Sequence, residues 1–154
     1  MNTKTKINKY EILDWGLKVK KSSAGLGLFA TKDIPKGVCL IEYFGREISE
    51  EEQYTSRSKY LFEINSKITI DGQARENIAR YINHSCKPNA EVEIKKKRIF
   101  IFSKRKIKAE EEICYDYGKE YFNEHIKKGG CRCVGCENKS KVKSQNSKVK
   151  VKSV

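Results

Sequence analysis

The chain has 154 residues and a formal net charge of +13, with 38% hydrophobic and 34% charged residues. This length suits one domain that buries roughly 70% of its unfolded surface, and no run approaches the ~20 apolar residues of a membrane helix. The charged start, "MNTKTKINKYEILDWG", lacks the apolar core of a secretory signal. We therefore expect an intracellular, reducing environment without membrane contact, in which the six cysteines are thiols or metal ligands rather than disulfides.

The positive charge favours acidic partners, nucleic acid above all. However, 26 of the 33 basic residues are lysine, whereas the readout of specific bases depends heavily on arginine. An abundance of lysine, isoleucine and asparagine is also typical of a coding sequence rich in A and T. The charge therefore predicts nonspecific contact with nucleic acid, and it assigns no function by itself.

Short strands separated by turn signals are expected from Leu17 to Ile113, after a polar, lysine-rich start. The segment 38–48, "VCLIEYFGREI", is long and apolar, as in a strand that is covered on both faces. The segment 50–59, "EEEQYTSRSK", reads as a polar connection. The other expected strands are "GLKVKKS" (16–22), "GLGLFAT" (25–31), "YLFEI" (60–64), "ITIDG" (68–72), "AEVEI" (90–94), "IFIF" (99–102) and "EEICYDYG" (111–118).

Helix is expected in two places. "ENIARYINH" (76–84) contains the best helical turn of the middle of the chain, and "KEYFNEHIKKGG" (119–130) reads as a short helix ended by two glycines. Residues 138–154 are rich in lysine and lack aromatic residues, which is typical of a disordered basic tail. This tail is either a solvated end without a specific role or a segment that binds polyanions. The predicted fold class is mostly β, with few short helices.

A cluster of thiols follows the second helix. "CRCVGC" places Cys131, Cys133 and Cys136 within six residues, too close for easy pairing as disulfides. Zinc takes four tetrahedral ligands, and Cys86 is the candidate for the fourth because it lies in a polar, turn-forming segment. We therefore expect a structural zinc site of four thiolates, with independent thiols as the alternative. The two other cysteines lie in apolar strands, where a thiol behaves as a small hydrophobe: Cys39 and Cys114.

The stretch "ARYINHSCKPN" (79–89) raises a question, because buried asparagine and histidine need hydrogen-bonding partners. It belongs to an ordered set with "GLGLFATKDIPKG" (25–37), "IEYFGREI" (41–48) and "EEICYDYG" (111–118). This set, followed by the cysteine cluster, strongly resembles the SET-domain protein lysine methyltransferases that carry a post-SET zinc-binding segment. The resemblance covers residues 17–136, although the cysteine cluster is two residues shorter than the family's usual pattern.

The resemblance implies a fold of small curved sheets, in which the "NHSC" and "YDYG" segments cross in a pseudoknot-like arrangement. It divides the chain into an N-terminal extension (1–14), a SET domain (15–118), a post-SET helix with the cysteine cluster (119–137) and the basic tail (138–154). The implied methyl donor is S-adenosylmethionine, to which backbone at glycines comes close. The implied donor-binding residues are Gly25, Leu26, Gly27, Arg80, Asn83, His84 and Tyr117, with a surface or structural ion pair as the alternative for Arg80.

Methyl transfer requires a neutral lysine amine, although the usual pKa of lysine is ~10.4. A desolvated channel beside a sulfonium lowers that pKa. The resemblance implies that Tyr117 is the catalytic tyrosine and that Tyr43 forms part of the aromatic channel, whereas a core aromatic is the alternative for each. Tyr115 falls at the position that controls the product, where the extra hydroxyl of tyrosine implies that addition stops at one or two methyl groups.

The resemblance thus predicts an S-adenosylmethionine-dependent protein lysine N-methyltransferase that adds one or two methyl groups to histone or other lysine-rich tails. We expect a monomer, located in the nucleus or on chromatin for a eukaryotic or host-targeted enzyme and in the cytoplasm otherwise. The alternatives are a catalytically inactive, zinc-stabilised interaction module with the same fold and a nucleic-acid-binding protein.

Overall fold

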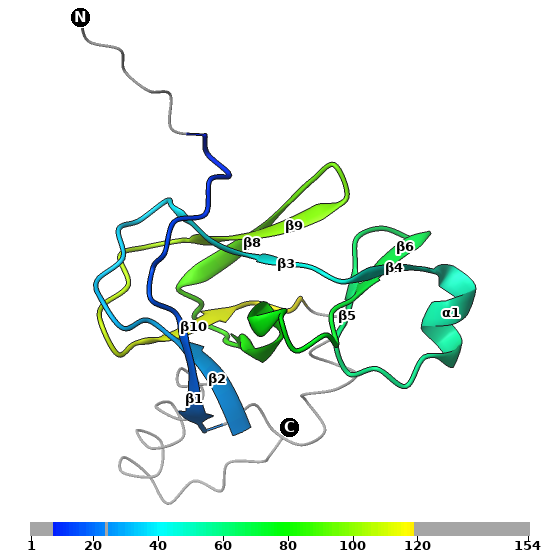
Figure 1. The fold of residues 1–154 in the computed structure, drawn as a ribbon, viewed down its shortest axis with the longest axis horizontal. Helices are drawn as coiled ribbons and strands as arrows, with labels where there is room; N and C mark the ends of the chain where they lie inside the picture. Colours follow the sequence, from blue (N-terminus) through cyan, green and yellow to red (C-terminus); the bar gives the residue numbers. More distant parts are fainter. Residues whose placement is uncertain (1–7, 24, 119–154) are drawn as a thin grey trace, which may run out of the picture.

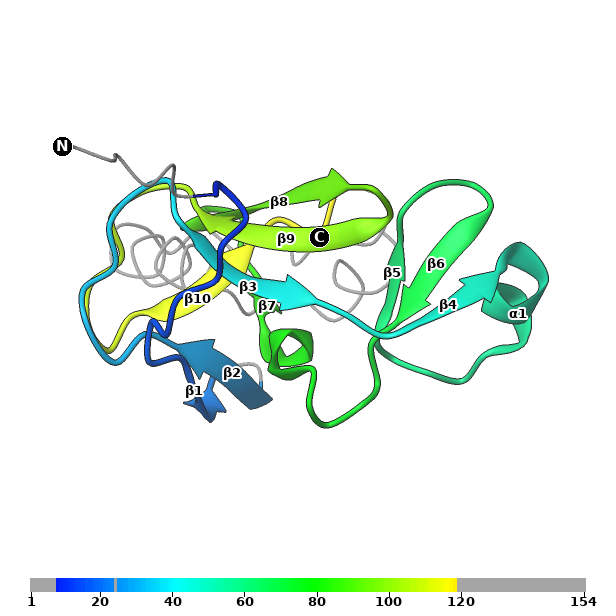
Figure 2. The same ribbon diagram turned by 45° about the horizontal axis from the view of Figure 1, so that its top comes forward.

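Short strands dominate the part of the chain that this computed structural model describes, residues 8–23 and 25–118. They form three small sheets (Figure 1, Figure 2), so the predicted mostly β fold is confirmed. Within these residues, no helix has the length and apolar character to cross a bilayer. In chain order the elements are β1 (Lys18–Ser22), β2 (Gly25–Phe29), β3 (Cys39–Tyr43), β4 (Arg46–Ser49), α1 (Glu50–Thr55), β5 (Leu61–Glu63), β6 (Ile68–Asp71), the 3-10 helix η1 (Ile78–Tyr81), β7 (Asn83–His84), β8 (Ala90–Lys95), β9 (Arg98–Ser103) and β10 (Glu112–Tyr115).

The four-stranded sheet has the order β1-β2-β10-β7. Strand β2 pairs antiparallel with both β1 and β10, and the fully buried Leu28 and Ile113 lie opposite each other in the register of β2 and β10. The two-residue strand β7 instead runs parallel to β10, with Asn83 opposite Cys114 and His84 opposite Tyr115. This parallel pairing places the "NHSC" and "YDYG" segments side by side.

The second sheet, β3-β9-β8, is covered on both faces. Along β9, Ile99 and Ile101 are fully buried in the main core, whereas Phe100 and Phe102 belong to a second cluster. Tyr10 covers that second cluster, with its ring centroid 4.9 Å from that of Phe100 and 5.9 Å from that of Phe102. The residues before β1 therefore shield the outer face of this sheet from water.

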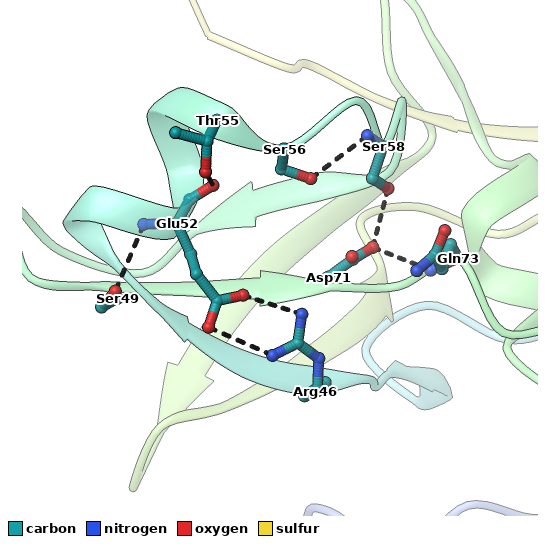
Figure 3. A network of polar contacts seen from close by, with 8 residues as sticks. All are labelled: Arg46, Ser49, Glu52, Thr55, Ser56, Ser58, Asp71 and Gln73. Carbon is teal, nitrogen blue, oxygen red and sulfur yellow. Dashed lines mark hydrogen bonds and ion pairs between the residues drawn. The ribbon is translucent and has the colours of Figure 1, made fainter.

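The third sheet, β4-β6-β5, lies with α1 at one end of the molecule (Figure 2). The hydroxyl of Ser49 accepts a 3.2 Å hydrogen bond from the Glu52 amide, which caps α1. Arg46 donates to both carboxylate oxygens of Glu52, at 3.3 and 2.8 Å, and Ser58 donates to Asp71 at 2.7 Å (Figure 3). These bonds fix the short helix and the loop after it to the sheet.

The prediction of one strand over residues 38–48 is wrong, because β3 ends at Tyr43 and β4 begins at Arg46. At Gly45 a Cβ would lie 2.0 Å from the carbonyl oxygen of Asp71, so only glycine fits there. The polar connection predicted at 50–59 contains α1, while the other predicted strands of residues 16–118 and the helical turn near residue 80 are present. The helix predicted at 119–130 lies outside the described residues.

Candidate active site

The three tyrosines predicted to act in catalysis lie together in a row of aromatic side chains. Ring centroids are 5.4 Å apart for Tyr43 and Phe62, 6.3 Å for Phe62 and Tyr115, and 4.9 Å for Tyr115 and Tyr117. These separations lie in the range of favourable aromatic contacts. We call these four residues the aromatic row. It joins β3, β5 and the end of β10, and therefore residues from all three sheets.

Backbone carbonyls orient the hydroxyls at the two ends of the aromatic row. Tyr43 donates a 2.6 Å hydrogen bond to the carbonyl of Tyr60, and Tyr117 donates to the carbonyl of Ile82. A phenol that donates its proton in this way still has oxygen lone pairs that accept from an amine. Tyr43 and Tyr115 are only 5% and 6% exposed, which gives the row the apolar surroundings that hold an amine neutral.

The His84 ring lies beside Tyr117 at the end of the aromatic row, with 5.5 Å between the two ring centroids. Its Nδ1 accepts the Tyr117 amide at 3.1 Å, so the neutral ring carries its hydrogen on Nε2. Burial lowers the pKa of His84, although the nearby Asp116 carboxylate raises it, and the ring is neutral at physiological pH. The Nε2–H then points to Cys86, whose Sγ lies 3.5 Å away. His84 thus links the aromatic row to the predicted zinc ligand.

Asn83 is bonded within the protein, at the edge formed by β1, β2 and β10. Its amide nitrogen lies 2.9 Å from the carbonyl oxygen of Leu26, 3.0 Å from a carboxylate oxygen of Glu112 and 3.1 Å from the hydroxyl of Ser22. A Cβ on Gly27 would lie 2.7 Å from the same carboxylate, so the glycine makes room for Glu112. The predicted donor-binding residues of β2 and β7 are therefore brought together.

Gly25 and Leu26 form the open part of this edge. Gly25 has a φ of +102°, and a Cβ there would meet nothing within 4 Å. Leu26 is 48% exposed. Gly25 and the side chain of Leu26 are therefore exposed at this edge, whereas the Leu26 carbonyl accepts the Asn83 side-chain amide.

Arg80 makes its contacts within the protein. Its guanidinium carbon lies 4.7 Å from the ring centroids of both Tyr60 and Tyr81, and its nitrogens donate to the Gln73 carbonyl and the Tyr81 hydroxyl. Such cation–aromatic contacts stabilise the loop around Tyr60. These contacts with aromatic rings and a carbonyl favour a structural role for Arg80, in place of the surface or structural ion pair that was the sequence-based alternative. Donor binding by this residue stays a prediction.

The cysteines of the described chain differ in their surroundings. Cys86 is exposed in the loop after β7, whereas Cys39 is buried in β3, where burial raises the pKa of its thiol to about 11. Cys114 is half-buried in β10. Residues 8–23 and 25–118 contain no group of three or more His, Cys, Asp or Glu that could hold a metal. The other predicted zinc ligands lie outside the described residues: Cys131, Cys133 and Cys136.

Three residues of this region were not predicted from sequence. Phe62 looks like any apolar strand residue, and only the packing shows that it connects Tyr43 to Tyr115. Glu112 is one of three consecutive glutamates, of which it alone reaches Asn83. Asn77 is fully buried. It is a polar residue close to the motif at 79–89, and this position could have indicated a buried side chain with hydrogen-bonding partners.

Comparison with known proteins agrees with this arrangement. The family model described as "SET domain" matches residues 25–118. The chain is 45% identical over 105 residues to histone-lysine N-methyltransferase trr of Drosophila melanogaster. This match covers 60% of this chain and 4% of that protein. It is 41% identical over 123 residues to histone-lysine N-methyltransferase 2D of Homo sapiens, and that match covers 71% of this chain and 2% of that protein. The chain thus spans only a few per cent of the length of these relatives.

Solved structures with the same fold support the assignment. A humanized mutant of the Chaetomium thermophilum Polycomb Repressive Complex 2 bound to an inhibitor matches with a TM-score of 0.58 and 35% sequence identity, over 66% of this chain and 14% of that one. An apo form of ctPRC2 with mutations in Ezh2 matches with a TM-score of 0.61 and 35% identity, over 67% of this chain and 15% of that one. The family model covers well over half of the sequence, and the chain belongs to the SET-domain family.

Proposed function

We propose that the chain is an S-adenosylmethionine-dependent protein lysine N-methyltransferase. The observation that carries this proposal is the aromatic row, which ends at Tyr117 beside the neutral ring of His84. A lysine side chain that enters charged and reacts neutral suits apolar walls with a few oriented hydroxyls. The relatives named as histone-lysine N-methyltransferases support the same activity, because they share 41–45% identity with this chain.

The residues at the edge of β2 and β7 fit the methyl donor. The donor supplies a methyl group on a positively charged sulfur. The open space at Gly25 and the exposed side chain of Leu26 leave room for it, and the Glu112 carboxylate and the Tyr117 ring favour a cationic ligand. In this proposal Asn83 and His84 hold the donor through their backbone groups, because their side chains are bonded within the protein.

The protein's contribution to the reaction is orientation and desolvation. Tyr117 accepts a hydrogen bond from the amine and aligns its lone pair with the methyl group, and Tyr43 and Phe62 exclude water along the entrance. Orientation of two reactants can contribute ~7–11 kcal/mol to lowering a barrier. The proton that the amine loses leaves to solvent before transfer, since the apolar walls lower the lysine pKa.

Tyr115 limits the product to one or two methyl groups in this proposal. It lies between Phe62 and Tyr117 and is 6% exposed, so its hydroxyl occupies space next to the reacting amine. Each added methyl group needs room that a tyrosine takes and a phenylalanine leaves. The proposed substrates are histones or other lysine-rich tails, as the names of the relatives suggest.

We further propose that Cys86 binds a structural zinc ion with the three cysteines of the "CRCVGC" cluster. Cys86 is exposed and accessible to such a cluster, and the Nε2–H of His84 lies 3.5 Å from its sulfur. Hydrogen bonds of this kind to ligating atoms orient and stabilise metal sites. Zinc there would attach the C-terminal segment next to the aromatic row.

The place of action in this proposal is chromatin, in a nucleus of the source organism or of a host. The basic tail, residues 138–154, makes nonspecific contact with nucleic acid near the substrate. Deletion of the tail should then weaken DNA binding and its salt dependence, and unchanged DNA affinity would contradict the tail's role. The enzyme itself is tested by incubation with labelled donor and core histones or a cell extract, with Tyr117→Phe as the control.

A further inference from the structure

We propose that Asn77 is a positioning residue for Tyr43, an inference that rests on the proposed methyltransferase function. Asn77 is 0% exposed and lies immediately before η1. A buried amide without partners costs free energy, so both of its polar atoms need partners from the surrounding backbone. Those partners belong to two segments that both contact Tyr43.

The Asn77 side chain connects the ends of two strands from different sheets. Its Nδ2 donates to the carbonyl of Gly72 at 3.0 Å, and Gly72 directly follows β6. Its Oδ1 accepts from the amide of Phe44 at 3.2 Å, and Phe44 directly follows Tyr43 at the end of β3. One amide group therefore holds the break between β3 and β4 against the end of β6.

The Tyr43 ring packs against the backbone of Gly72. A Cβ at Gly72 would lie 2.5 Å from Cε1 and Cζ of Tyr43, so backbone and ring are in direct contact. The Gly72 amide donates at 2.8 Å to the Tyr60 carbonyl, which also accepts the Tyr43 hydroxyl at 2.6 Å. A shift of Gly72 therefore moves both the ring and the hydroxyl acceptor of Tyr43.

Loss of the bond to Gly72 should displace Tyr43 and leave the donor edge intact. Asn77→Asp, studied at a pH at which this buried carboxyl is ionised, keeps an acceptor for the Phe44 amide but turns a carboxylate oxygen toward the Gly72 carbonyl, which repels it. The donor edge at Gly25 and Leu26 belongs to another sheet. Misplacement of about 1 Å at a substrate-positioning group can cost ~10²-fold in rate, so kcat for a peptide should fall 10- to 100-fold, with donor affinity unchanged.

The position of Tyr43 can be read directly by fluorine NMR. The protein is labelled with 3-fluorotyrosine, and the resonance of Tyr43 is the one that Tyr43→Phe removes. Asn77→Asp is expected to shift or broaden this resonance. The matched control is Ser103→Ala, which removes an equally buried polar bridge between Val38 and Pro35, near the opposite end of β3. It should lower stability without moving the Tyr43 resonance.

An unchanged Tyr43 resonance in the folded Asn77→Asp protein would overturn the proposal, and so would an equal shift in Ser103→Ala. If Asn77→Asp does not fold, Asn77→Ser takes its place, because a serine is too short to reach both partners. The fluorine signal does not depend on activity. Failure of the proposed function would appear separately, as a lack of methyl transfer by the unaltered protein while the Tyr43 resonance still responds to Asn77.

Discussion

Removal of the Tyr43 hydroxyl should affect activity more than stability. In Tyr43→Phe the ring still packs on Phe62 and Gly72, and only the 2.6 Å bond to the Tyr60 carbonyl is lost. A typical hydrogen bond contributes ~0.5–1.5 kcal/mol. The Tyr60 carbonyl still accepts the Gly72 amide at 2.8 Å, so no buried acceptor is left unpaired. We therefore expect the free energy of unfolding to fall by about 0.5–1 kcal/mol.

Urea unfolding, followed by the fluorescence of the single tryptophan, Trp15, measures this change. Activity should fall about tenfold in kcat/KM for a lysine peptide, a transition-state cost of ~1.4 kcal/mol. Tyr54→Phe is the matched control, because Tyr54 is 79% exposed and the same atom is removed from the surface. A stability loss above ~3 kcal/mol, or equal activity loss in Tyr54→Phe, would refute the assignment of Tyr43 to the channel.

Three further predictions concern the product, the metal and acid stability. Tyr115→Phe should raise the methylation state seen by mass spectrometry, and abundant trimethyl-lysine from the unaltered enzyme would contradict this. Cys86→Ser should lower the zinc content measured by mass spectrometry, whereas full retention would exclude Cys86 as a ligand. Burial raises the pKa of Glu111, but hydrogen bonds from Arg105 and the Lys108 amide outweigh it and lower that pKa below 4.5. The Glu111 carboxylate thus binds its proton more weakly in the folded than in the unfolded protein, so its stabilisation is present above pH ~4.5 and lost as pH falls further. Glu111→Gln should therefore flatten the dependence of unfolding free energy on pH between about pH 5 and pH 3. An unchanged slope would contradict this prediction.

Local signals in the sequence predicted most of the strands. The strands expected at 90–94 and 99–102 are present as β8 and β9, which pair antiparallel across the intervening lysine-rich turn. The break after Tyr43 could not be predicted in this way, because the Asp71 carbonyl and the Asn77 side chain impose it from distant positions. Pairing between segments far apart in the chain decides such features, and no local pattern records it.

The same distinction applies to the site. Tyr117 was predicted because its motif is specific, and its ring centroid lies 4.9 Å from that of Tyr115 in the structure. Phe62 carries no such signal, because an apolar residue in a short strand has the same pattern whether it lines a channel or fills the core. For Arg80 the motif predicts donor binding, which stays a prediction, while the structure shows its contacts with Tyr60 and Tyr81.

Transfer of a labelled methyl group to lysine tests the central claim most directly. The unaltered protein, given labelled S-adenosylmethionine and core histones or a cell extract, should label lysine side chains. Tyr117→Phe, which removes one hydroxyl and keeps the ring, should label them about 10²-fold more slowly while calorimetry still detects donor binding. Equal labelling by both proteins, or no labelling by the unaltered one, would contradict the account.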